Sequence, residues 1–304
     1  MSESTTPIEA ITGSVMSPSH FDWLDMKYRV RMRAFVSLCM PPVFSNLESQ
    51  IKMMALRKQG YAPIMYFLDF RSGTTPIAFG RALENSHTLR LCRSAAEQRV
   101  FLHSRSVLRA KSRSHGPEAL GYDDGSGAMV EAGTAEALHV ITRPMAPPGE
   151  RQVTTAPEEL RLLKEHAWDG PMPSIENLSV PPEGYERLDL GAWAERTDVW
   201  GIPNTDINQH VNVQEYVRGG ENAFTRALHG AGLPIARHHI TRARLVFRRP
   251  FFPGQTYMIR ATLYRRDNAT QLQAGYYALE NGKPAERPSS FLVYDGIIED
   301  ENAR

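Results

Sequence analysis

The sequence predicts an α+β protein made of two similar units, each with one long helix followed by several antiparallel strands. Three observations predict this class: both halves of the chain show the same order of elements, a proline-rich segment separates them, and 304 residues with 41% hydrophobic content suffice for two ordinary cores. We expect units at 17–145 and 183–298, a linker at 146–182, and flexible tails at 1–16 and 299–304.

In the first unit, a strand-like run at 28–35 precedes a helix predicted from about 42 to 59, which Gly60 would end. The helix is inferred from apolar residues at helical spacings, namely Phe44, Leu47, Ile51, Met54 and Leu56. Strand-like runs separated by Gly, Ser and Asn then follow at 62–70, 76–83, 88–93 and 99–110.

The segment between the units, residues 144–182, contains eight of the 21 prolines. Proline cannot donate a hydrogen bond to a neighbouring strand, so this density argues against a packed sheet here. Within the segment, Pro157 is followed by Glu158 and Glu159, the composition of a first helical turn. We therefore predict one short helix in the linker, ending near Gly170.

The second unit begins with a strand-like run at 185–190 and a loop. A helix is predicted from about Val213 to Ala231, because Val213, Val217, Phe224 and Leu228 recur at spacings of four and seven, and Gly232 would end it. Predicted strands follow at 242–249, 255–265, 270–280 and 289–295, with Pro253-Gly254 and Asn281-Gly282 as turns.

Composition excludes several classes of function. Lys and Arg number 35 against 34 Asp and Glu, so the net charge of +1 gives no electrostatic case for binding nucleic acid or an anionic membrane. The two cysteines, Cys39 and Cys92, are too few and too far apart for a disulfide framework or a metal site, and we expect small buried side chains. With no signal-like N-terminus and no apolar run of ~20 residues, the expectation is a soluble cytoplasmic protein.

The most informative stretch is 204–216, which places Asp206, Asn208 and His210 within five residues, just before the second predicted helix. A helix N-terminus has backbone N–H groups without intrahelical acceptors and the positive end of the helix dipole. A carbonyl that becomes an oxyanion would be stabilised there. The three side chains at this position suit the chemistry of acyl transfer.

Residues 206–216 read Asp-Ile-Asn-Gln-His-Val-Asn-Val-Gln-Glu-Tyr. This run resembles the signature Asp-x-Asn-x-His-Val-Asn-Asn-x-x-Tyr of hotdog-fold thioesterases, most closely the second half of the acyl-acyl-carrier-protein thioesterases of plants and bacteria. The one departure within the signature is Val213, where the family usually has a second Asn. The resemblance implies a tandem, or double, hotdog, in which each antiparallel sheet wraps a long central helix.

The resemblance also implies roles for individual residues. Asp206, Asn208 and His210 would be catalytic, and Asn212 and Tyr216 would support the loop and helix. The acyl chain would lie near Val213–Val217, against the first unit, so the predicted substrate-binding residues are Asn212, Val213, Tyr216 and Val217. The implied substrate is an acyl-CoA or acyl-carrier-protein thioester.

A second departure from the family lies on the strand after the helix, where a Tyr-Arg-Arg is followed by a Glu-Cys pair assigned to catalysis. Here the run is Phe247-Arg248-Arg249-Pro250-Phe251-Phe252. Pro250 and Phe251 can neither hold a proton nor attack a carbonyl, so Asp206 would serve alone, as nucleophile or as general base. The apolar replacements favour a specialised acyl group over a straight-chain one.

Other functions remain as alternatives. A catalytically silent protein that binds acyl thioesters would also fit the loss of the Glu-Cys pair, and a hotdog hydratase or dehydratase is a third option, although its His, Gly and Pro spacing is missing. The sequence has no G-x-S-x-G, no HExxH and no paired CxxC, so we expect no metal and no cofactor. His238-His239 is interpreted as loop, and the assembly as a monomeric pseudo-dimer or a homodimer.

The two predicted helices can be superimposed on their terminal glycines, Gly60 and Gly232, which gives an offset of 172 residues. Without gaps, this offset puts the three motif residues opposite Ala34, Val36 and Leu38. The alignment predicts that the first unit lacks the catalytic groups. It therefore predicts one active site per chain, with the first unit forming a wall of the acyl pocket.

Overall fold

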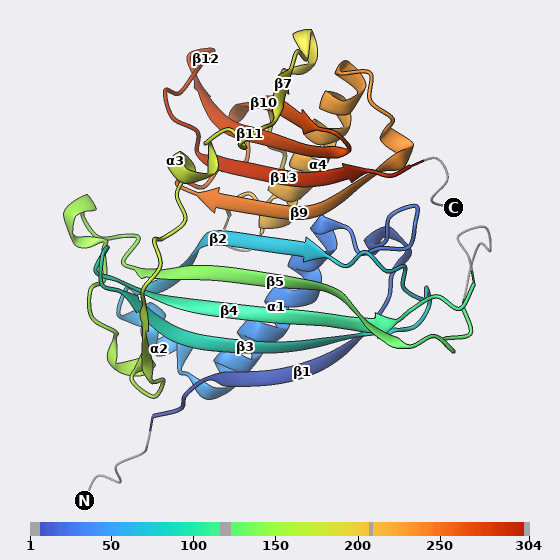
Figure 1. Cartoon of the computed structure of the whole chain (residues 1–304). Helices are drawn as coiled ribbons and strands as arrows, with labels where there is room; N and C mark the ends of the chain where they lie inside the picture. The colour runs from blue at the N-terminus through green and yellow to red at the C-terminus, as the bar shows by residue number, and fades with distance from the viewer. Residues whose placement is uncertain (1–6, 116–122, 207–208, 301–304) are drawn as a thin grey trace, which may run out of the picture.

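The computed structural model describes residues 7–115, 123–206 and 209–300. Thirteen strands in these residues form one large, mostly antiparallel sheet, whose main order is β1-β3-β4-β5-β2-β9-β13-β11-β10-β7 (Figure 1). The strands of the first half are β1 (Ile11–Pro18), β2 (Ala62–Ser72), β3 (Ala82–Ser94), β4 (Arg99–Lys111) and β5 (Met129–Thr142), followed by β6 (Glu165–Trp168). Those of the second half are β7 (Glu186–Leu188), β8 (Glu195–Val199), β9 (His238–Phe247), β10 (Thr256–Arg266), β11 (Ala269–Glu280), β12 (Lys283–Pro284) and β13 (Ser290–Ile298).

The two halves of the sheet repeat one arrangement. The order β1-β3-β4-β5-β2 in the first half corresponds to β7-β10-β11-β13-β9 in the second. The halves join through β2 and β9, which pair antiparallel from Phe67 opposite Val246 to Arg71 opposite Arg242. Across this join the guanidinium of Arg242 donates to both carboxylate oxygens of Asp69, at 2.8 and 2.5 Å.

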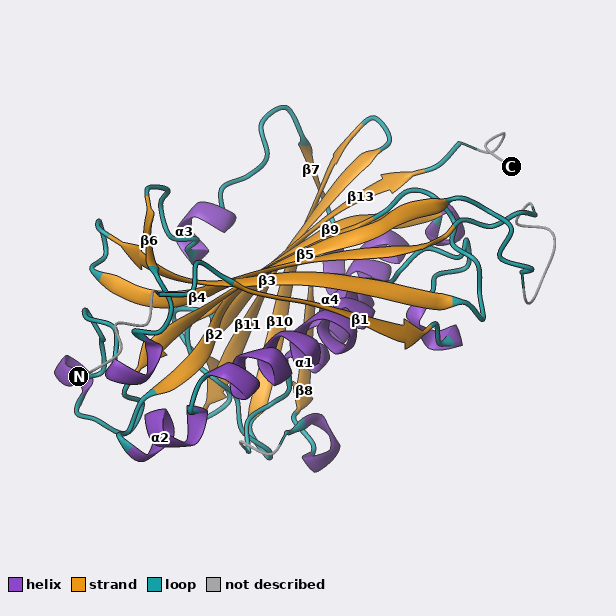
Figure 2. Cartoon of the chain, turned by 90° about the horizontal axis from the view of Figure 1, so that it is seen from below, coloured by secondary structure: helices purple, strands orange, loops and turns teal. Residues whose placement is uncertain are grey.

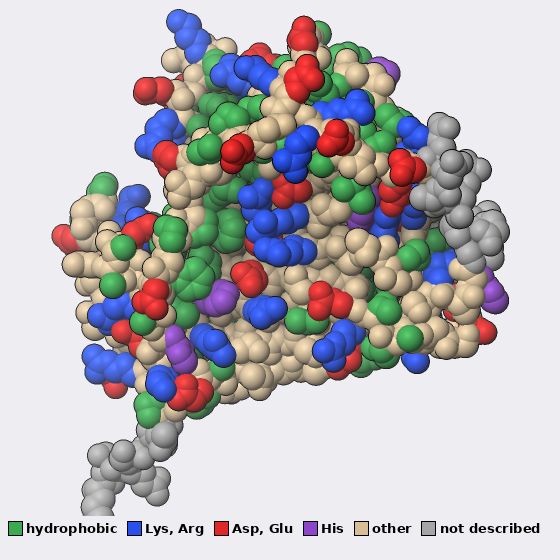
Figure 3. All heavy atoms as spheres, in the orientation of Figure 1, with side chains coloured by type: hydrophobic (Ala, Val, Ile, Leu, Met, Phe, Trp, Pro, Cys, Tyr) green, Lys and Arg blue, Asp and Glu red, His purple; other side chains and the backbone are tan. Residues whose placement is uncertain are grey.

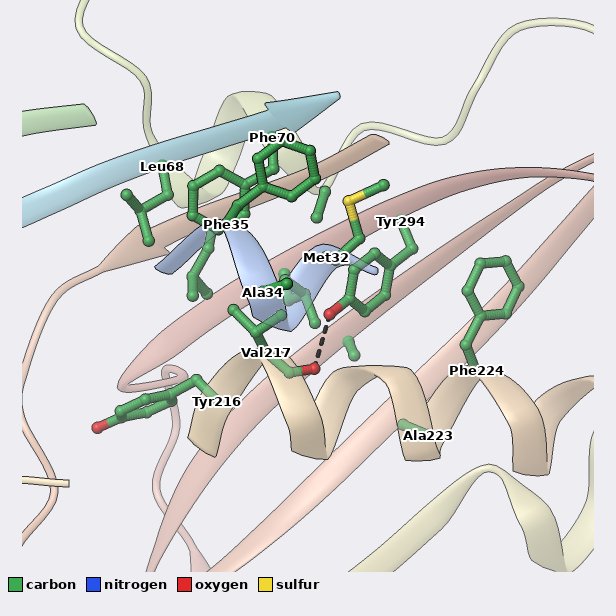
Figure 4. Packing of buried hydrophobic residues seen from close by; sticks show 14 of the residues in the cluster. Met32, Ala34, Phe35, Leu68, Phe70, Tyr216, Val217, Ala223, Phe224 and Tyr294 are labelled. Atoms are coloured by element: carbon green, nitrogen blue, oxygen red, sulfur yellow. Dashed lines mark hydrogen bonds between the residues drawn. The ribbon is translucent and has the colours of Figure 1, made fainter. Parts of the chain in front are cut away.

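Two long helices, α1 (Met32–Gln50) and α4 (Val213–Gly230), cover one face of the sheet and touch each other (Figure 2). The side chain of Val217, which is fully buried, lies against α1 near Ala34 (Figure 4). Tyrosines of the sheet hold α4 in place: Tyr294 donates its hydroxyl to the Val217 carbonyl at 2.7 Å, and Tyr276 donates to the Tyr216 carbonyl at 2.6 Å. Both hydroxyls are buried, so these bonds satisfy them inside the core.

The structure contradicts the predicted strand at 28–35 and the predicted helix start at 42, because α1 already begins at Met32. The helix is buried between the sheet and α4, so its first turns lack the polar stripe that would reveal a helical period. Pro41 and Pro42 also lie inside it. Pro42 has no N–H for the Leu38 carbonyl, and the buried Asn85 side chain donates to that carbonyl instead, at 2.7 Å.

Several other predictions for the first half and the linker need correction. A short helix α2 (Met53–Lys58) follows α1, most of the run at 76–83 is loop, and strands β1 and β5 were not predicted. In the linker, Glu158–Leu160 is a single 3-10 turn rather than a helix reaching Gly170, and β6 pairs parallel with β3. After β6 comes the short helix α3 (Ile175–Leu178). Met172, just before α3, is buried against Cys92, Phe101 and Leu138.

The second half follows the prediction more closely. Helix α4 starts at the predicted residue and is followed by Gly232 in the left-handed region, at φ +66°. Strands β10, β11 and β13 lie within a few residues of their predicted bounds. The exception is β9, which begins at His238, so the pair His238-His239 lies in a strand and not in a loop.

The outer face of the sheet, opposite the long helices, carries interspersed charges of both signs (Figure 3). Arg244 pairs with Asp295 on neighbouring strands, as Arg242 does with Asp69. Both cysteines are free and buried, as expected, and burial raises the thiol pKa of Cys39 to about 12 and that of Cys92 to about 11. Within the described ranges, no helix is both long and apolar enough to cross a membrane.

Candidate functional site

The loop before α4 carries the predicted catalytic residues. It begins with a 3-10 turn, Ile202–Asn204, and closes on itself where Thr205 and Val211 form an antiparallel bridge. The Asp206 N–H donates to the His210 carbonyl at 3.0 Å, so these two residues face each other across a tight loop. Gln209 has a φ of +62° in the same loop. Asn208 lies outside the described residues.

Backbone and side-chain bonds join this loop to the first turn of α4. Asn212 is the N-cap, since its side-chain oxygen accepts from the Gln214 N–H at 2.8 Å. Its own N–H donates to the Asn204 carbonyl, also at 2.8 Å. The Asn204 amide in turn donates to Glu215 at 2.7 Å, and Arg218 pairs with the same carboxylate. Asn204 and Glu215 were not predicted as functional residues, because no sequence pattern distinguishes them from ordinary helix-entry residues.

The segment after β9 lies directly beside the motif loop. Phe251 donates its N–H to the Tyr216 hydroxyl at 3.1 Å and accepts at its carbonyl from the Val211 N–H at 2.9 Å. The Phe251 side chain is buried, whereas Phe252 is 42% exposed and stands edge-on to His210, with ring centroids 5.1 Å apart. Phe251 and Phe252 therefore contact the motif loop and the start of α4, and they contribute no ionisable group there.

The predicted substrate-binding residues differ in accessibility. Val213 and Asn212 are partly buried at the start of α4, whereas Tyr216 and Val217 belong to the hydrophobic core. Tyr216 packs against an aromatic group that includes Trp200, Phe247 and Tyr276. A cavity of about 300 Å³ lies elsewhere in the second half, lined by residues 187–191 together with Ala194, Ala261 and Thr262. That Asn212, Val213, Tyr216 and Val217 bind a substrate stays a prediction.

The loop before α1 repeats the backbone of the motif loop at an offset of 181 residues. Leu24 and Val30 form the bridge that Thr205 and Val211 form in the second half. The 3-10 turn Phe21–Trp23 corresponds to Ile202–Asn204. Tyr28 has the same φ, +62°, as Gln209.

This repeat corrects the alignment of the two halves. The offset of 172 is nine residues too small, and Ala34, Val36 and Leu38 all lie inside α1. At an offset of 181, the counterparts of Asp206, Asn208 and His210 are Asp25, Lys27 and Arg29. The first half therefore has the aspartate and carries two cations in place of the amide and the imidazole.

In the first half, the side chains of Asp25, Lys27 and Arg29 form ion pairs within the loop, with β9 and with Glu299 near the end of the chain. The Asp25 carboxylate accepts from the N–H groups of Lys27 and Arg29 and lies 3.3 Å from the His239 ring nitrogen. Lys27 and Arg29 both pair with Glu299. Burial raises the pKa of Asp25, but the hydrogen bond with His239 and the charge of Arg29 outweigh it, and the pKa is about 2. The network connects the first loop to β9 and to the residues after β13.

The chemistry that the motif loop offers is that of a carboxylate and an imidazole in one tight loop, placed at the N-terminus of a long helix. Over the described part of the chain, no three His, Cys, Asp or Glu side chains gather closely enough to hold a metal ion. The carboxylate of Asp206 and the imidazole of His210 are groups of the kinds used in acid-base and nucleophilic catalysis, and the loop that carries them leads directly into the start of α4.

No family model matches the sequence, and no curated protein does. Solved structures do resemble the fold. An acyl-ACP thioesterase from Bacteroides thetaiotaomicron is 11% identical, with 94% of this chain and 97% of that chain covered and a TM-score of 0.60. A protein described as an oleoyl thioesterase from Lactobacillus plantarum is 11% identical, with 97% of this chain and 98% of that chain covered and a TM-score of 0.65.

The 12:0-ACP thioesterase from Umbellularia californica is 12% identical, with 95% of each chain covered and a TM-score of 0.63. The likeness in all three cases extends over nearly the whole of both chains, so it includes the join between the halves of the sheet as well as each half. At such low identity the comparison establishes the fold and leaves activity open. The chain therefore has the fold of acyl-ACP thioesterases, a large antiparallel sheet with few helices.

Proposed function

We propose that the protein is a double-hotdog thioesterase that hydrolyses an acyl-CoA or acyl-carrier-protein thioester to the free carboxylic acid. The observation that carries the proposal is the Asp-x-Asn-x-His loop directly before α4, in a chain with the fold of acyl-ACP thioesterases. Two halves joined in one sheet would take the places of two hotdog subunits, with one active site in the second half.

The proposed mechanism rests on Asp206. Its carboxylate either attacks the thioester carbon, giving an anhydride that water then hydrolyses, or takes a proton from a water that attacks instead. In both routes the C–S bond breaks and the sulfur leaves as a thiolate, which takes a proton from the protonated Asp206 in the general-base route and from solvent in the nucleophilic route. His210, and Asn208 outside the described residues, would hydrogen-bond to the carbonyl or orient the water, and the N-terminus of α4 would stabilise the oxyanion.

The proposed substrate carries a specialised acyl group. Support comes from the exposed ring of Phe252 beside His210, directly after Pro250 and Phe251, which align with the acid and the thiol of the family. Thioesters are activated acyl donors, so the barrier is smaller than for an amide, and the proposal assigns the reaction to one carboxylate with its hydrogen-bonding partners.

The test is release of free thiol from purified protein with a panel of acyl-CoA and acyl-carrier-protein thioesters. The proposal expects steady turnover for at least one acyl group, abolished or strongly reduced by Asp206→Asn. Binding without thiol release would instead support a catalytically silent acyl-binding protein. The observation that favours this alternative is the absence of the Glu-Cys pair. Addition or loss of water on the acyl group without thiol release would identify a hydratase or dehydratase.

A further inference from the structure

Phe252 is an exposed aromatic ring held against the motif histidine. Its ring stands nearly perpendicular to that of His210, at an interplanar angle of 82° with 5.1 Å between centroids, and 42% of the residue is exposed. Its neighbour Phe251 is 1% exposed and does the packing in the core. Of these two phenylalanines, Phe252 is therefore the one that offers free apolar surface next to the proposed catalytic group.

The backbone holds Phe252 in a fixed place. Its N–H donates to the Gln255 side chain at 2.9 Å, and its carbonyl accepts from the Gln255 N–H at 3.2 Å. Gly254, at φ +82°, donates to the Trp200 carbonyl at 2.7 Å, which fastens the turn to the end of β8. On the other side, the two backbone bonds of Phe251 fasten the turn to the motif loop and to α4.

A ring presented in this way favours a ligand that can cover it. Covering exposed apolar surface is favourable, and aromatic rings gain further from edge-to-face or offset contacts with another ring. Because the turn is already ordered by its hydrogen bonds, little conformational entropy is lost when a ligand binds there. A flat acyl group whose carbonyl is next to His210 would meet the Phe252 ring.

We propose that Phe252 is a specificity-determining residue, which selects thioesters with an aromatic acyl group by contact with the acyl ring beside His210. The inference rests on the proposed function, since it takes the motif loop as the place where the thioester carbonyl binds. It goes beyond that function in naming the residue that reads the acyl group and the chemical class that it prefers.

The experiment measures binding of two non-hydrolysable thioethers, S-phenacyl-pantetheine and S-acetonyl-pantetheine, to the full chain by calorimetry. They share the pantetheine arm of CoA and of carrier proteins and differ only in a phenyl against a methyl group. We expect the wild type to bind the phenacyl compound at least about 10-fold more tightly, which is the scale of a well-formed apolar contact. Phe252→Ala should reduce this preference to about 3-fold or less, and Phe252→Trp should keep it.

Met145→Ala is the control, because Met145 is 93% exposed and lies in the loop after β5. This variant should prefer the phenacyl over the acetonyl compound as strongly as the wild type does. No preference in the wild type, or the same preference in Phe252→Ala, would overturn the inference. Thiol release is measured separately with benzoyl-CoA and acetyl-CoA. A protein that shows the Phe252-dependent preference but releases no thiol from these two compounds or from the whole panel above would refute only the proposed thioesterase activity.

Discussion

At the scale of single residues, the two halves give a matched pair of aspartates. Asp206 and Asp25 occupy equivalent positions in two loops with the same backbone bonds. Asp25 is engaged by Arg29, which occupies the position of His210 in its own loop, and by His239 of β9. We therefore expect Asp25 to act in stability, whereas Asp206 is the aspartate proposed for catalysis.

Asp206→Asn should lower turnover by at least ~10²-fold, the scale of losing a general base, because the amide keeps the size of the side chain and removes its charge. Thiol release under saturating substrate checks this, with circular dichroism to show an unchanged fold. Cys39→Ala and Cys92→Ala serve as controls and should leave the rate nearly unchanged. Near-wild-type release by Asp206→Asn would place the active site elsewhere.

Buried histidines should make stability depend on pH. Burial lowers the pKa of His139 and of His238 to about 4, against 6.5 when exposed. Between these values the unfolded state binds more protons, so the free energy of unfolding falls as the pH drops from about 6.5 to 4. Between pH 7 and pH 5, the free energy of unfolding of His139→Leu should fall by about 2 kcal/mol less than that of the wild type, as measured by urea unfolding. An unchanged pH slope in this variant would show that His139 titrates normally.

At the scale of elements, α1 illustrates how a helix accommodates two internal prolines. The Asn85 side chain replaces the donor that Pro42 lacks, at the carbonyl of Leu38. This long-range contact between β3 and α1 cannot be inferred from local sequence. It satisfies the carbonyl that Pro42 leaves without a helical donor, and so removes one of the costs of continuing the helix past Pro42.

A double-mutant cycle tests this account. Asn85→Leu should destabilise the protein by ~1–2 kcal/mol, because it leaves the Leu38 carbonyl buried without a donor. In a Pro42→Ala background, the helix supplies its own N–H, and the same change should cost less than ~0.5 kcal/mol. Additive effects in chemical denaturation would contradict the proposed replacement.

The loop before α1 should act in stability and not in turnover. Asp25→Asn removes the charge that Arg29 and His239 compensate, so we expect a loss of ~1–3 kcal/mol in the free energy of unfolding and a rate within about 2-fold of wild type. Because the pKa of Asp25 is depressed to about 2, its contribution is present above pH 3.8 and is lost as the pH falls toward 2. A large loss of rate without loss of stability would show that this loop has a catalytic role.

At the scale of the whole molecule, one sheet unites the two halves. The join consists of β2 and β9 with the Asp69–Arg242 pair, together with the contact between α1 and α4. Neither half of the sheet is closed at this edge by itself, and an unpaired central edge is a site for aggregation.

The chain should therefore unfold in a single cooperative transition. Calorimetry is expected to give a calorimetric enthalpy equal to the van't Hoff enthalpy. Residues 1–145 expressed alone should be insoluble or lack a cooperative transition, because the β2 edge and the α4-facing side of α1 would be exposed. Two separate transitions in the whole chain would show that each half folds independently.

The sequence by itself determined the features that depend on local pattern. The amphipathic helix α4, its glycine stop and the strands after it follow from spacing and turn residues, and the motif before α4 identified the region of the candidate site. These signals are local because α4 has one buried and one exposed face.

Tertiary structure decided what depends on partners distant in the chain. The start of α1 is hidden because that helix is buried on several sides and needs Asn85 of β3. The alignment of the two halves at an offset of 181 follows from the equivalent bridges Leu24–Val30 and Thr205–Val211. A comparison of the sequences without gaps does not find it. Phe252 contacts His210 because the backbone of the neighbouring Phe251 is hydrogen-bonded to Val211 and to Tyr216. These hydrogen bonds join residues far apart in the chain, so no local residue pattern predicts the contact.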